Sequence, residues 1–338
     1  MTRTPEETEQ ALQEIRRAVD LTTPYAIRAA VTLDLASHVG GGVGGGVAVA
    51  ELAAAVGAQV DGVRKLVRLL ARDEYFTLTD DQVALGSRGW VLLEDAVRSR
   101  LDHGRGYARV DDAWPGLLDA LRTGGSGYEV ARGRSFYSEL GADEQLVSSF
   151  DGQLAEWSGH WTGRLVEALG LGDEHVVDVG GGTGALLGAV LLAYPGTRGT
   201  LVELPSTAER AGQFFAEQGV SGRVAVATQS FFEPLPAGAD LYLIAQVLHN
   251  WPDAEAVSIL KRLADAAGDA PIVIVERLTG GAENDADLAS DLLMYAVFGA
   301  GERSAAEFAA LAGEAGLELV ATRQVLGALS TLELRPRR

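Results

Sequence analysis

The fold of this chain is set at Val176-Val177-Asp178-Val179-Gly180-Gly181-Gly182-Thr183-Gly184, where an apolar run passes directly into glycines. The run predicts a buried strand, and Ala185 to Tyr194 predicts the helix that follows it. Glycines at such a turn let the backbone approach a ligand and present N–H groups at a helix N-terminus. Gly180, Gly181 and Gly182 are therefore candidate ligand-binding residues, the alternative being a tight turn with no ligand.

The chemistry of the expected ligand is indicated by Asp178, directly before the glycines. By spacing alone, Gly180, Gly182 and Ala185 also satisfy the relaxed dinucleotide pattern. A carboxylate at Asp178 is unfavourable beside a pyrophosphate, but it suits the ammonium group of a methionine moiety. Glu203, about 20 residues beyond the glycines, can accept both ribose hydroxyls of NAD or of S-adenosylmethionine. We therefore expect S-adenosylmethionine, with Asp178 and Glu203 among its ligands.

Around this stretch, apolar strands alternate with amphipathic helices, which predicts a parallel sheet in right-handed βαβ units. The tail differs, because Leu317–Gln324 and Ala328–Leu334 flank a tight Leu326-Gly327 turn and predict an antiparallel pair at the sheet edge. Such an ending is usual for methyltransferases. The expected fold class is α/β, a Rossmann-like methyltransferase domain with a mixed seven-stranded sheet. Strands are expected at 175–179, 199–203, 223–227, 240–245 and 271–276, with helices near 184–194, 206–218 and 253–266.

The first part of the chain has the pattern of a mostly helical winged-helix domain. Apolar residues recur at helical spacing from Leu12 to Ala36, with a break at Pro24. After a glycine-rich loop, Gly40–Gly46, a short helix and a second helix are expected, and then a two-stranded wing. The two helices are expected at Val49–Val56 and at Gly62–Ala71, the latter capped by Asp61, and the wing at Tyr75–Leu78 and Gln82–Leu85.

A winged helix raises the alternative of a DNA-binding regulator. Arg64, Lys65, Arg68 and Arg72 lie on the second helix, where such a protein would contact the major groove. Acidic residues close by and a formal charge of −19, from 28 basic and 47 acidic residues, oppose that alternative. We therefore expect no nucleic-acid partner.

Composition limits the remaining possibilities. There are no cysteines, which excludes disulfides, thiolate zinc sites and thiol catalysis. No apolar run reaches the roughly 20 residues that a bilayer span needs, and Met1–Gln10 lacks the features of a signal peptide. We expect a cytoplasmic protein with no membrane partner.

A candidate base follows the fourth expected strand, in the segment Leu248 to Asp253. Ligands of open α/β sheets bind beyond the carboxyl ends of the strands, and His249 can accept a proton at physiological pH. Asp253 is expected to cap the next helix. Glu276 ends the fifth strand and Glu302 precedes a Ser304/Glu307 capping box, so either carboxylate could orient His249. One candidate histidine and scattered carboxylates form no recognisable metal-ligand set, so we expect no metal.

Together these segments resemble small-molecule O-methyltransferases related to plant caffeic-acid-type and actinobacterial polyketide enzymes. The resemblance implies an interlocked homodimer built from the winged-helix domain, residues 1–105, and S-adenosylmethionine binding by residues 166–338. The helical linker 106–165 would contribute to the acceptor pocket. The resemblance rests on Pro24–Ala30, Glu51–Ala53, Arg64–Leu70, Gly133–Tyr137, Asp178–Gly184, Leu201–Pro205, Phe231–Glu233, Leu248–Trp251 and Gly301–Ser304.

The resemblance also implies residue roles. His249 would be the general base that removes a hydroxyl proton from a small aromatic acceptor, with Glu276 and Glu302 bracketing it. The helix Asp287–Phe298 would line the acceptor pocket. Further cofactor ligands would be Ser230, Phe231 and Gln246, and acceptor-binding residues would be Leu154, Trp157, Asn250, Met294, Tyr295 and Phe298.

Three positions depart from the family pattern. Glu203 replaces an aspartate, Gln229-Ser230 replace a Gly-Asp pair near the adenine, and Asn250 replaces an aspartate beside the histidine. These departures keep open a second enzymatic hypothesis. In it, the chain binds S-adenosylmethionine but catalyses hydroxylation, decarboxylation or ring closure.

Overall fold

The computed structural model describes residues 4–39, 46–281 and 285–337. The expected loop Gly40–Gly46 lies outside these residues except for Gly46. The chain divides into two compact units, Met1–Arg109 and Val110–Arg338. The expected linker, residues 106–165, belongs to the second unit from Val110 onward, and its first four residues belong to the first unit. Among the described residues, no helix combines the length and apolarity that crossing a bilayer demands.

The first unit has the helix, helix and wing order that the sequence predicts. Asp80 and Asp81, at φ 51° and 64°, form the turn of the wing, because two left-handed residues give a turn that matches strand twist. A core that includes Leu35, Leu52 and Phe76 joins the helices to the wing. The elements are α1 (Pro5–Ala18), α2 (Thr22–Thr32), α3 (Leu35–Val39), β1 (Val47–Ala48), α4 (Val49–Ala55), α5 (Val60–Arg72), β2 (Phe76–Thr79), β3 (Gln82–Leu85), η1 (Gly89–Leu93) and α6 (Asp95–Leu101).

The expected cap at Asp61 is wrong. Helix α5 begins at Val60, and Gln59 is its N-cap with an extended backbone and no side-chain hydrogen bond. Asp61 lies inside the first turn, where its carboxylate forms an ion pair with Lys65 at 2.6 Å. A capping residue needs an extended backbone, and Asp61 is already helical.

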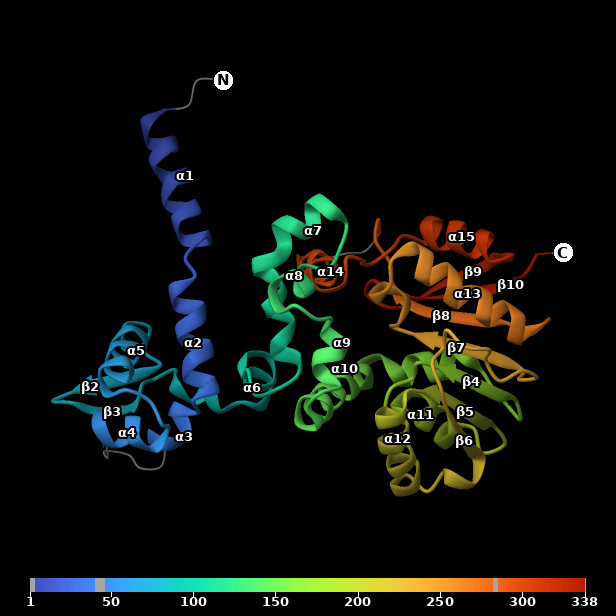
Figure 1. Ribbon diagram of the computed structural model, residues 1–338, viewed down its shortest axis with the longest axis horizontal. Helices are drawn as coiled ribbons and strands as arrows, with labels where there is room; N and C mark the ends of the chain where they lie inside the picture. Colours follow the sequence, from blue (N-terminus) through green and yellow to red (C-terminus); the bar gives the residue numbers. More distant parts are fainter. Residues whose placement is uncertain (1–3, 40–45, 282–284, 338) are drawn as a thin grey trace. The chain divides into compact units, whose positions relative to one another are not determined.

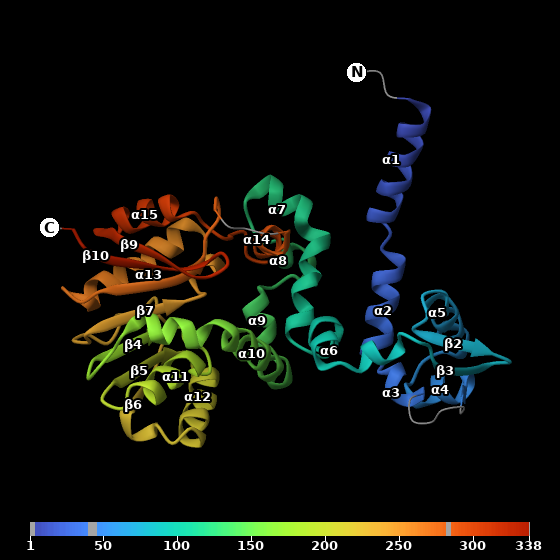
Figure 2. The ribbon, with the colours of Figure 1, turned by 180° about the vertical axis from the view of Figure 1, so that it is seen from behind.

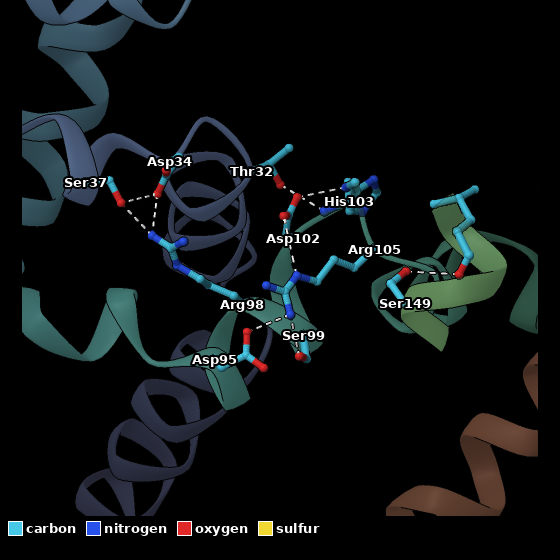
Figure 3. A network of polar contacts seen from close by, with 12 residues as sticks. Thr32, Asp34, Ser37, Asp95, Arg98, Ser99, Asp102, His103, Arg105 and Ser149 are labelled. Carbon is cyan, nitrogen blue, oxygen red and sulfur yellow. Dashed lines mark hydrogen bonds and ion pairs between the residues drawn. The ribbon is translucent and has the colours of Figure 1, made fainter. Parts of the chain in front are cut away.

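Two arginines hold the later part of this unit together (Figure 3). Arg98 of α6 contacts Asp34 at 2.5 Å and Ser37 at 2.6 Å, so it fixes the junction between α2 and α3. Arg105 contacts Asp95 at 2.8 Å and Ser99 at 2.8 Å. These contacts join the end of the unit back to its helices.

The second unit is built on a sheet of seven strands among the described residues, in the order β6-β5-β4-β7-β8-β10-β9. Strand β10 is antiparallel to both of its neighbours, β8 and β9, whereas the other strand pairs are parallel. This confirms the predicted mixed sheet and its antiparallel edge. The strands are β4 (His175–Val179), β5 (Arg198–Glu203), β6 (Val224–Thr228), β7 (Leu241–Ala245), β8 (Ile272–Arg277), β9 (Leu317–Leu326) and β10 (Leu329–Pro336).

Helices cover both faces of this sheet (Figure 1). Alternate residues of one strand enter different cores: Val177 packs with α13 and α15, and Val176 packs with α10, α11 and α12. From behind, β9 and β10 are seen beside α13 and α15 (Figure 2). The helical elements are η2 (Tyr107–Gly116), α7 (Leu117–Thr123), α8 (Gly127–Arg132), α9 (Phe136–Leu140), α10 (Glu144–Leu169), α11 (Ala185–Ala193), α12 (Pro205–Glu217), η3 (Ser221–Arg223), η4 (Leu248–Asn250), α13 (Asp253–Ala267), α14 (Asp285–Phe298) and α15 (Ala305–Glu314).

The strand order places a switch point at β4. The chain continues from β4 to β5 on one side, whereas β7, later in the chain, pairs with β4 on the other side. Open α/β sheets bind their ligands at this crevice, beyond the carboxyl ends of the strands. The glycine loop after β4 and the His249 segment after β7 both lie at this edge.

Candidate active site

The turn after β4 is shaped for a ligand. A Cβ at Gly181 would lie 2.2 Å from Asp178 Oδ2, so only glycine fits there. Gly182 has φ +60°, and a Cβ at this position would meet nothing within 4 Å. The backbone therefore folds over Asp178 at one glycine and faces open space at the next.

Asp178 is the strongest indication of what the crevice binds. Its side chain is fully buried, and neither carboxylate oxygen has a hydrogen-bond partner among the described residues. Burial, with a smaller contribution from the charge of Glu203, raises the pKa of Asp178 to about 7. A buried carboxylate without a partner is costly, and a ligand ammonium group would remove that cost. The residue fits the methionine end of S-adenosylmethionine.

Glu203 ends β5 at the same edge of the sheet. Burial raises the pKa of Glu203 to about 7 against the hydrogen bond from Leu204 N, and the charge of Asp151 raises it further. Asp151, on α10, contacts Arg210 of α12 at 2.5 Å. Glu203 thus lies in a largely buried acidic region next to the glycine loop.

The expected adenine side contains an aromatic cluster. The Phe231 ring packs near Gly180, where an added Cβ would approach ring atom Cε1 to 3.4 Å. Trp251 meets Phe231 edge-on at 5.7 Å and Phe232 at 4.9 Å. Ser230 Oγ accepts a hydrogen bond from Phe232 N at 3.2 Å, so it shapes this turn.

Three segments bring an ionisable group to one point. His249 comes from η4 after β7, Glu276 from the end of β8, and Glu302 from the turn before α15. His249 Nδ1 lies 3.3 Å from Glu276 Oε2 and 3.3 Å from Glu302 Oε1. Neither contact has the alignment of a hydrogen bond. The ring nitrogen on this side therefore faces two carboxylates, as in a base oriented by acidic partners.

The two carboxylates change the acidity of His249. Burial by itself lowers the pKa of an imidazole, but the nearby carboxylates of Glu276 and Glu302 outweigh it. Together they raise the pKa of His249 to about 9, against a smaller opposing effect of Arg303. Burial also raises the pKa of Glu276.

Glu276 also organises the loop that carries His249. Its Oε1 accepts hydrogen bonds from Val247 N at 3.0 Å and Leu248 N at 2.7 Å. Its Oε2 accepts one from Gln246 Nε2 at 2.9 Å, and Gln246 itself has φ 55°. The amide of Gln246 is thus directed at Glu276, and its expected contact with the cofactor stays a prediction.

Two expectations about acidic residues need correction. The carboxylates are not scattered, because the ligand atoms of His249, Glu276 and Glu302 lie within 4.8 Å of one another. Asp253 does not cap α13, because Pro252 is the N-cap and Asp253 is already helical. Asp253 instead contacts Arg303 at 2.8 Å. The Ser304/Glu307 capping box is confirmed.

Some of the expected acceptor residues contact other parts of the second unit, whereas others are exposed. Asn250 Nδ2 donates to Tyr137 Oη at 2.9 Å, and the Tyr137 ring stacks on Phe298 at 5.5 Å. These contacts join the His249 loop to α9 and α14. On α14, Met294 is partly buried and Tyr295 donates its hydroxyl to Ala120 O at 3.2 Å. Leu154 and Trp157 are exposed on α10, and their role stays a prediction.

A family model of the O-methyltransferase domain matches residues 114–318. The 2,7-dihydroxy-5-methyl-1-naphthoate 7-O-methyltransferase of Streptomyces carzinostaticus is 39% identical, over 92% of this chain and 94% of that protein. The chain belongs to the O-methyltransferase family.

Other members of the family agree with this fold and differ in chemistry. The O-methyltransferase NcsB1 of neocarzinostatin biosynthesis was solved with S-adenosylmethionine and 2-hydroxy-5-methyl naphthoic acid. That structure has a TM-score of 0.82 and 36% identity, covering 96% of this chain and 98% of that one. The aclacinomycin 10-hydroxylase of Streptomyces purpurascens is 34% identical, over 94% of this chain and 87% of that protein.

The sequence patterns do not single out several residues of the candidate site. Asp151 and Arg210 lie on helices α10 and α12, and the sequence marks Tyr137 and Arg303 only as part of the family pattern. Each acts through a partner distant in sequence, so periodicity could not single it out.

Proposed function

We propose that this protein transfers a methyl group from S-adenosylmethionine to a hydroxyl of a small aromatic acceptor, with His249 as general base. The observation that carries the proposal is His249 Nδ1 at 3.3 Å from both Glu276 and Glu302, at the sheet edge that holds the glycine loop. Naphthoate and other aromatic names among the relatives support an aromatic acceptor.

The proposed roles follow from the chain's own groups. When bound, S-adenosylmethionine supplies a methyl group on a positively charged sulfur, which an oxygen nucleophile can displace. Asp178 would pair with its ammonium group, and Glu203 would accept the ribose hydroxyls. His249 takes the proton of the acceptor hydroxyl at Nε2, because Nδ1 faces the carboxylates. Glu276 and Glu302 hold the ring in place and stabilise the imidazolium that forms.

The proposal is tested with methyl-labelled S-adenosylmethionine and 2,7-dihydroxy-5-methyl-1-naphthoate, the acceptor named for the 39% identical relative. We expect label in a methyl ether and equimolar S-adenosylhomocysteine. EDTA should leave the yield unchanged, because His249 rather than a metal ion is proposed to activate the acceptor. A panel of simpler phenols and naphthols defines the acceptor class. Cofactor binding without label on any acceptor would contradict methyl transfer.

One relative keeps a second function in view. The aclacinomycin 10-hydroxylase is 34% identical to this chain, so the relatives include an enzyme named for an activity other than methylation. A hydroxylating, decarboxylating or ring-closing enzyme would convert an acceptor without transferring label. Mass analysis of the same reactions distinguishes these products from a methyl ether by their mass change.

Replacing Glu302 by glutamine should shift the pH profile. Loss of the carboxylate charge lowers the pKa of His249, since that charge favours the imidazolium. A protonated histidine cannot act as base, so the acidic limb of kcat/KM should move to lower pH by about one unit or more. Stopped assays from pH 5.5 to 9.5 measure this shift.

Glu307→Gln is the matched control for this experiment. It removes a carboxylate from the start of α15, where Glu307 bonds Ser304 rather than His249. Its pH profile should keep the wild-type midpoint. An unmoved limb in Glu302→Gln would mean that Glu302 does not set the acidity of the base.

We also propose a cytoplasmic homodimer formed through the first unit. Helix α1 buries none of its residues within the chain, and Leu12, Ile15 and Val19 are exposed at helical spacing. An amphipathic helix with an uncovered apolar stripe is favoured to pack on another surface. Sedimentation velocity of the full chain should give a dimer; a monomer would contradict this part.

The DNA-binding alternative finds little support. Arg64 pairs with Asp81, Lys65 with Asp61, and Arg72 with Asp73. These ion pairs offset much of the positive charge that phosphate contacts require. A gel shift with mixed-sequence duplex DNA at low salt should show no complex.

A further inference from the structure

Arg303 follows Glu302 directly and is buried, with 7% of its surface exposed. Its guanidinium donates to Leu248 O at 3.0 Å and to Trp251 O at 2.7 Å. These two carbonyls lie on either side of His249 in the chain. Arg303 therefore holds the loop that carries His249 through one carbonyl on each side of that residue.

Two further groups fix the guanidinium. Asp253 Oδ1 accepts from its Nε at 3.0 Å and from its Nη2 at 2.8 Å. The guanidinium carbon, Cζ, lies over the face of the Phe308 ring, 5.9 Å from its centroid. The carboxylate of Asp253 balances the positive charge, and the ring of Phe308 on α15 packs against the guanidinium plane. The Arg303 side chain is therefore held in one orientation.

The backbone of Arg303 contacts the residues that directly follow β8, the strand that carries Glu276. Thr279 N donates to Arg303 O at 3.2 Å, and Leu278 forms a bridge with Arg303. These residues continue the chain from β8, which ends with Glu276 and Arg277. On the other side, Glu302 N donates to Asp291 Oδ1 at 2.8 Å. Arg303 thus contacts the segments that carry His249 and Glu276, and it adjoins Glu302.

We propose that Arg303 is a positioning residue, which holds the His249 loop against Glu276 and Glu302 by binding the carbonyls of Leu248 and Trp251. The proposal rests on the function inferred above and adds a residue to it. Lysine cannot replace this contact in full, because a single ammonium group lacks the planar fork that reaches two carbonyls and a carboxylate together.

The test uses Arg303→Met and Arg303→Lys in the full-length protein. We expect kcat to fall about 10- to 100-fold in Arg303→Met, the range seen when outer residues that orient a site are removed. Arg303→Lys should lose less, and KM for the cofactor should change little in either. Circular dichroism and thermal unfolding establish that each variant is folded, and Arg303→Lys decides the question should Arg303→Met fail to fold.

A matched control lies elsewhere in the unit. Arg223 also donates to carbonyls, at Tyr194 O (3.2 Å), Thr197 O (3.0 Å) and Leu191 O (2.6 Å). It lies in η3, before β6, and contacts none of the three ionisable groups. Arg223→Met and Arg223→Lys should lower thermal stability by comparable amounts and leave kcat at the wild-type value.

NMR titration of His249 gives a readout that needs no turnover. The chain has five histidines, and the resonance absent from a His249→Gln variant identifies this one. Arg303→Lys keeps the positive charge, so a lower pKa of His249 in this variant would report a ring displaced from its carboxylates. That lower pKa, together with the fall in kcat, is the expected result.

The proposal is overturned if folded Arg303→Lys leaves the His249 titration unchanged, or if the Arg223 variants lose as much kcat. If wild-type protein transfers no methyl group, the proposed function fails by itself. In that case the titration still decides whether Arg303 positions His249.

Discussion

His249→Ala should reduce kcat by about 10²- to 10⁴-fold, the usual contribution of a general base. His249 is the imidazole that Glu276 and Glu302 orient, so its removal leaves the acceptor proton without an acceptor in the protein. Single-turnover assays with labelled S-adenosylmethionine measure the loss. Alignment of the reactants should preserve the remaining rate, because positioning alone can supply effective molarities of ~10⁵ M and above.

Cofactor binding distinguishes loss of the base from damage to the site. Calorimetry should give His249→Ala nearly the wild-type affinity for S-adenosylhomocysteine, because Asp178 and Glu203 are untouched. His160→Ala, an exposed change on α10, should leave both turnover and binding unchanged. Turnover of His249→Ala equal to wild type would refute the base assignment while leaving methyl transfer in place.

Asp178→Asn should weaken binding of S-adenosylmethionine by about 10- to 100-fold, because a hydrogen bond to a charged group contributes roughly 1.5–3 kcal/mol. The wild-type carboxylate is buried with no partner among the described residues, so the ligand ammonium group is its expected counterpart. Isothermal titration with the cofactor and with S-adenosylhomocysteine measures the affinities. Equal affinity in the two proteins would show that Asp178 is not a ligand of the cofactor.

Asp178 should also affect stability with a definite sign. Its pKa is raised to about 7 in the folded chain from its ordinary value of 3.8. The folded state therefore holds a proton that the unfolded state releases, and this stabilising contribution is lost as pH rises from about 4 through 7. Thermal unfolding of the ligand-free protein between pH 4.5 and 8 should show a smaller decline for Asp178→Asn than for wild type.

The cofactor should reverse this decline in the wild type. A cation bound at Asp178 stabilises the ionised carboxylate, so S-adenosylmethionine should raise Tm more at pH 8 than at pH 5. In Asp178→Asn that difference should be much reduced. Glu203, His249 and Glu276 titrate in both proteins. The difference in Tm behaviour between wild type and Asp178→Asn therefore reports the contribution of Asp178.

The proposed mechanism combines a ready-made binding edge with an oriented base. The glycine loop and Asp178 come from β4, Glu203 from β5, His249 from the segment after β7 and Glu276 from β8. These are neighbouring strands whose carboxyl ends meet at the switch point. The fold therefore brings the proposed cofactor ligands and the proposed base to one place from widely separated parts of the chain.

Much of the fold was predictable because it depends on local chemistry. Alternation of apolar strands and amphipathic helices located β4 to β8 and the antiparallel pair β9 and β10 to within a few residues. The capping box at Ser304 was predictable for the same reason, since both partners lie within one turn. The caps expected at Asp61 and Asp253 failed because the helix starts depend on backbone angles, which residue type alone does not fix.

The sequence by itself determined the alternating α/β pattern, the glycine turn behind Asp178, and a histidine at the end of a strand. Periodicity and short-range spacing are enough for these. Only the tertiary structure decided that Glu276 and Glu302 both face His249 Nδ1. It also decided that Arg303 donates to the carbonyls on either side of His249, and that Asn250 donates to Tyr137. Those contacts join residues distant in sequence, and their distances follow from how the strands and helices pack rather than from any local rule.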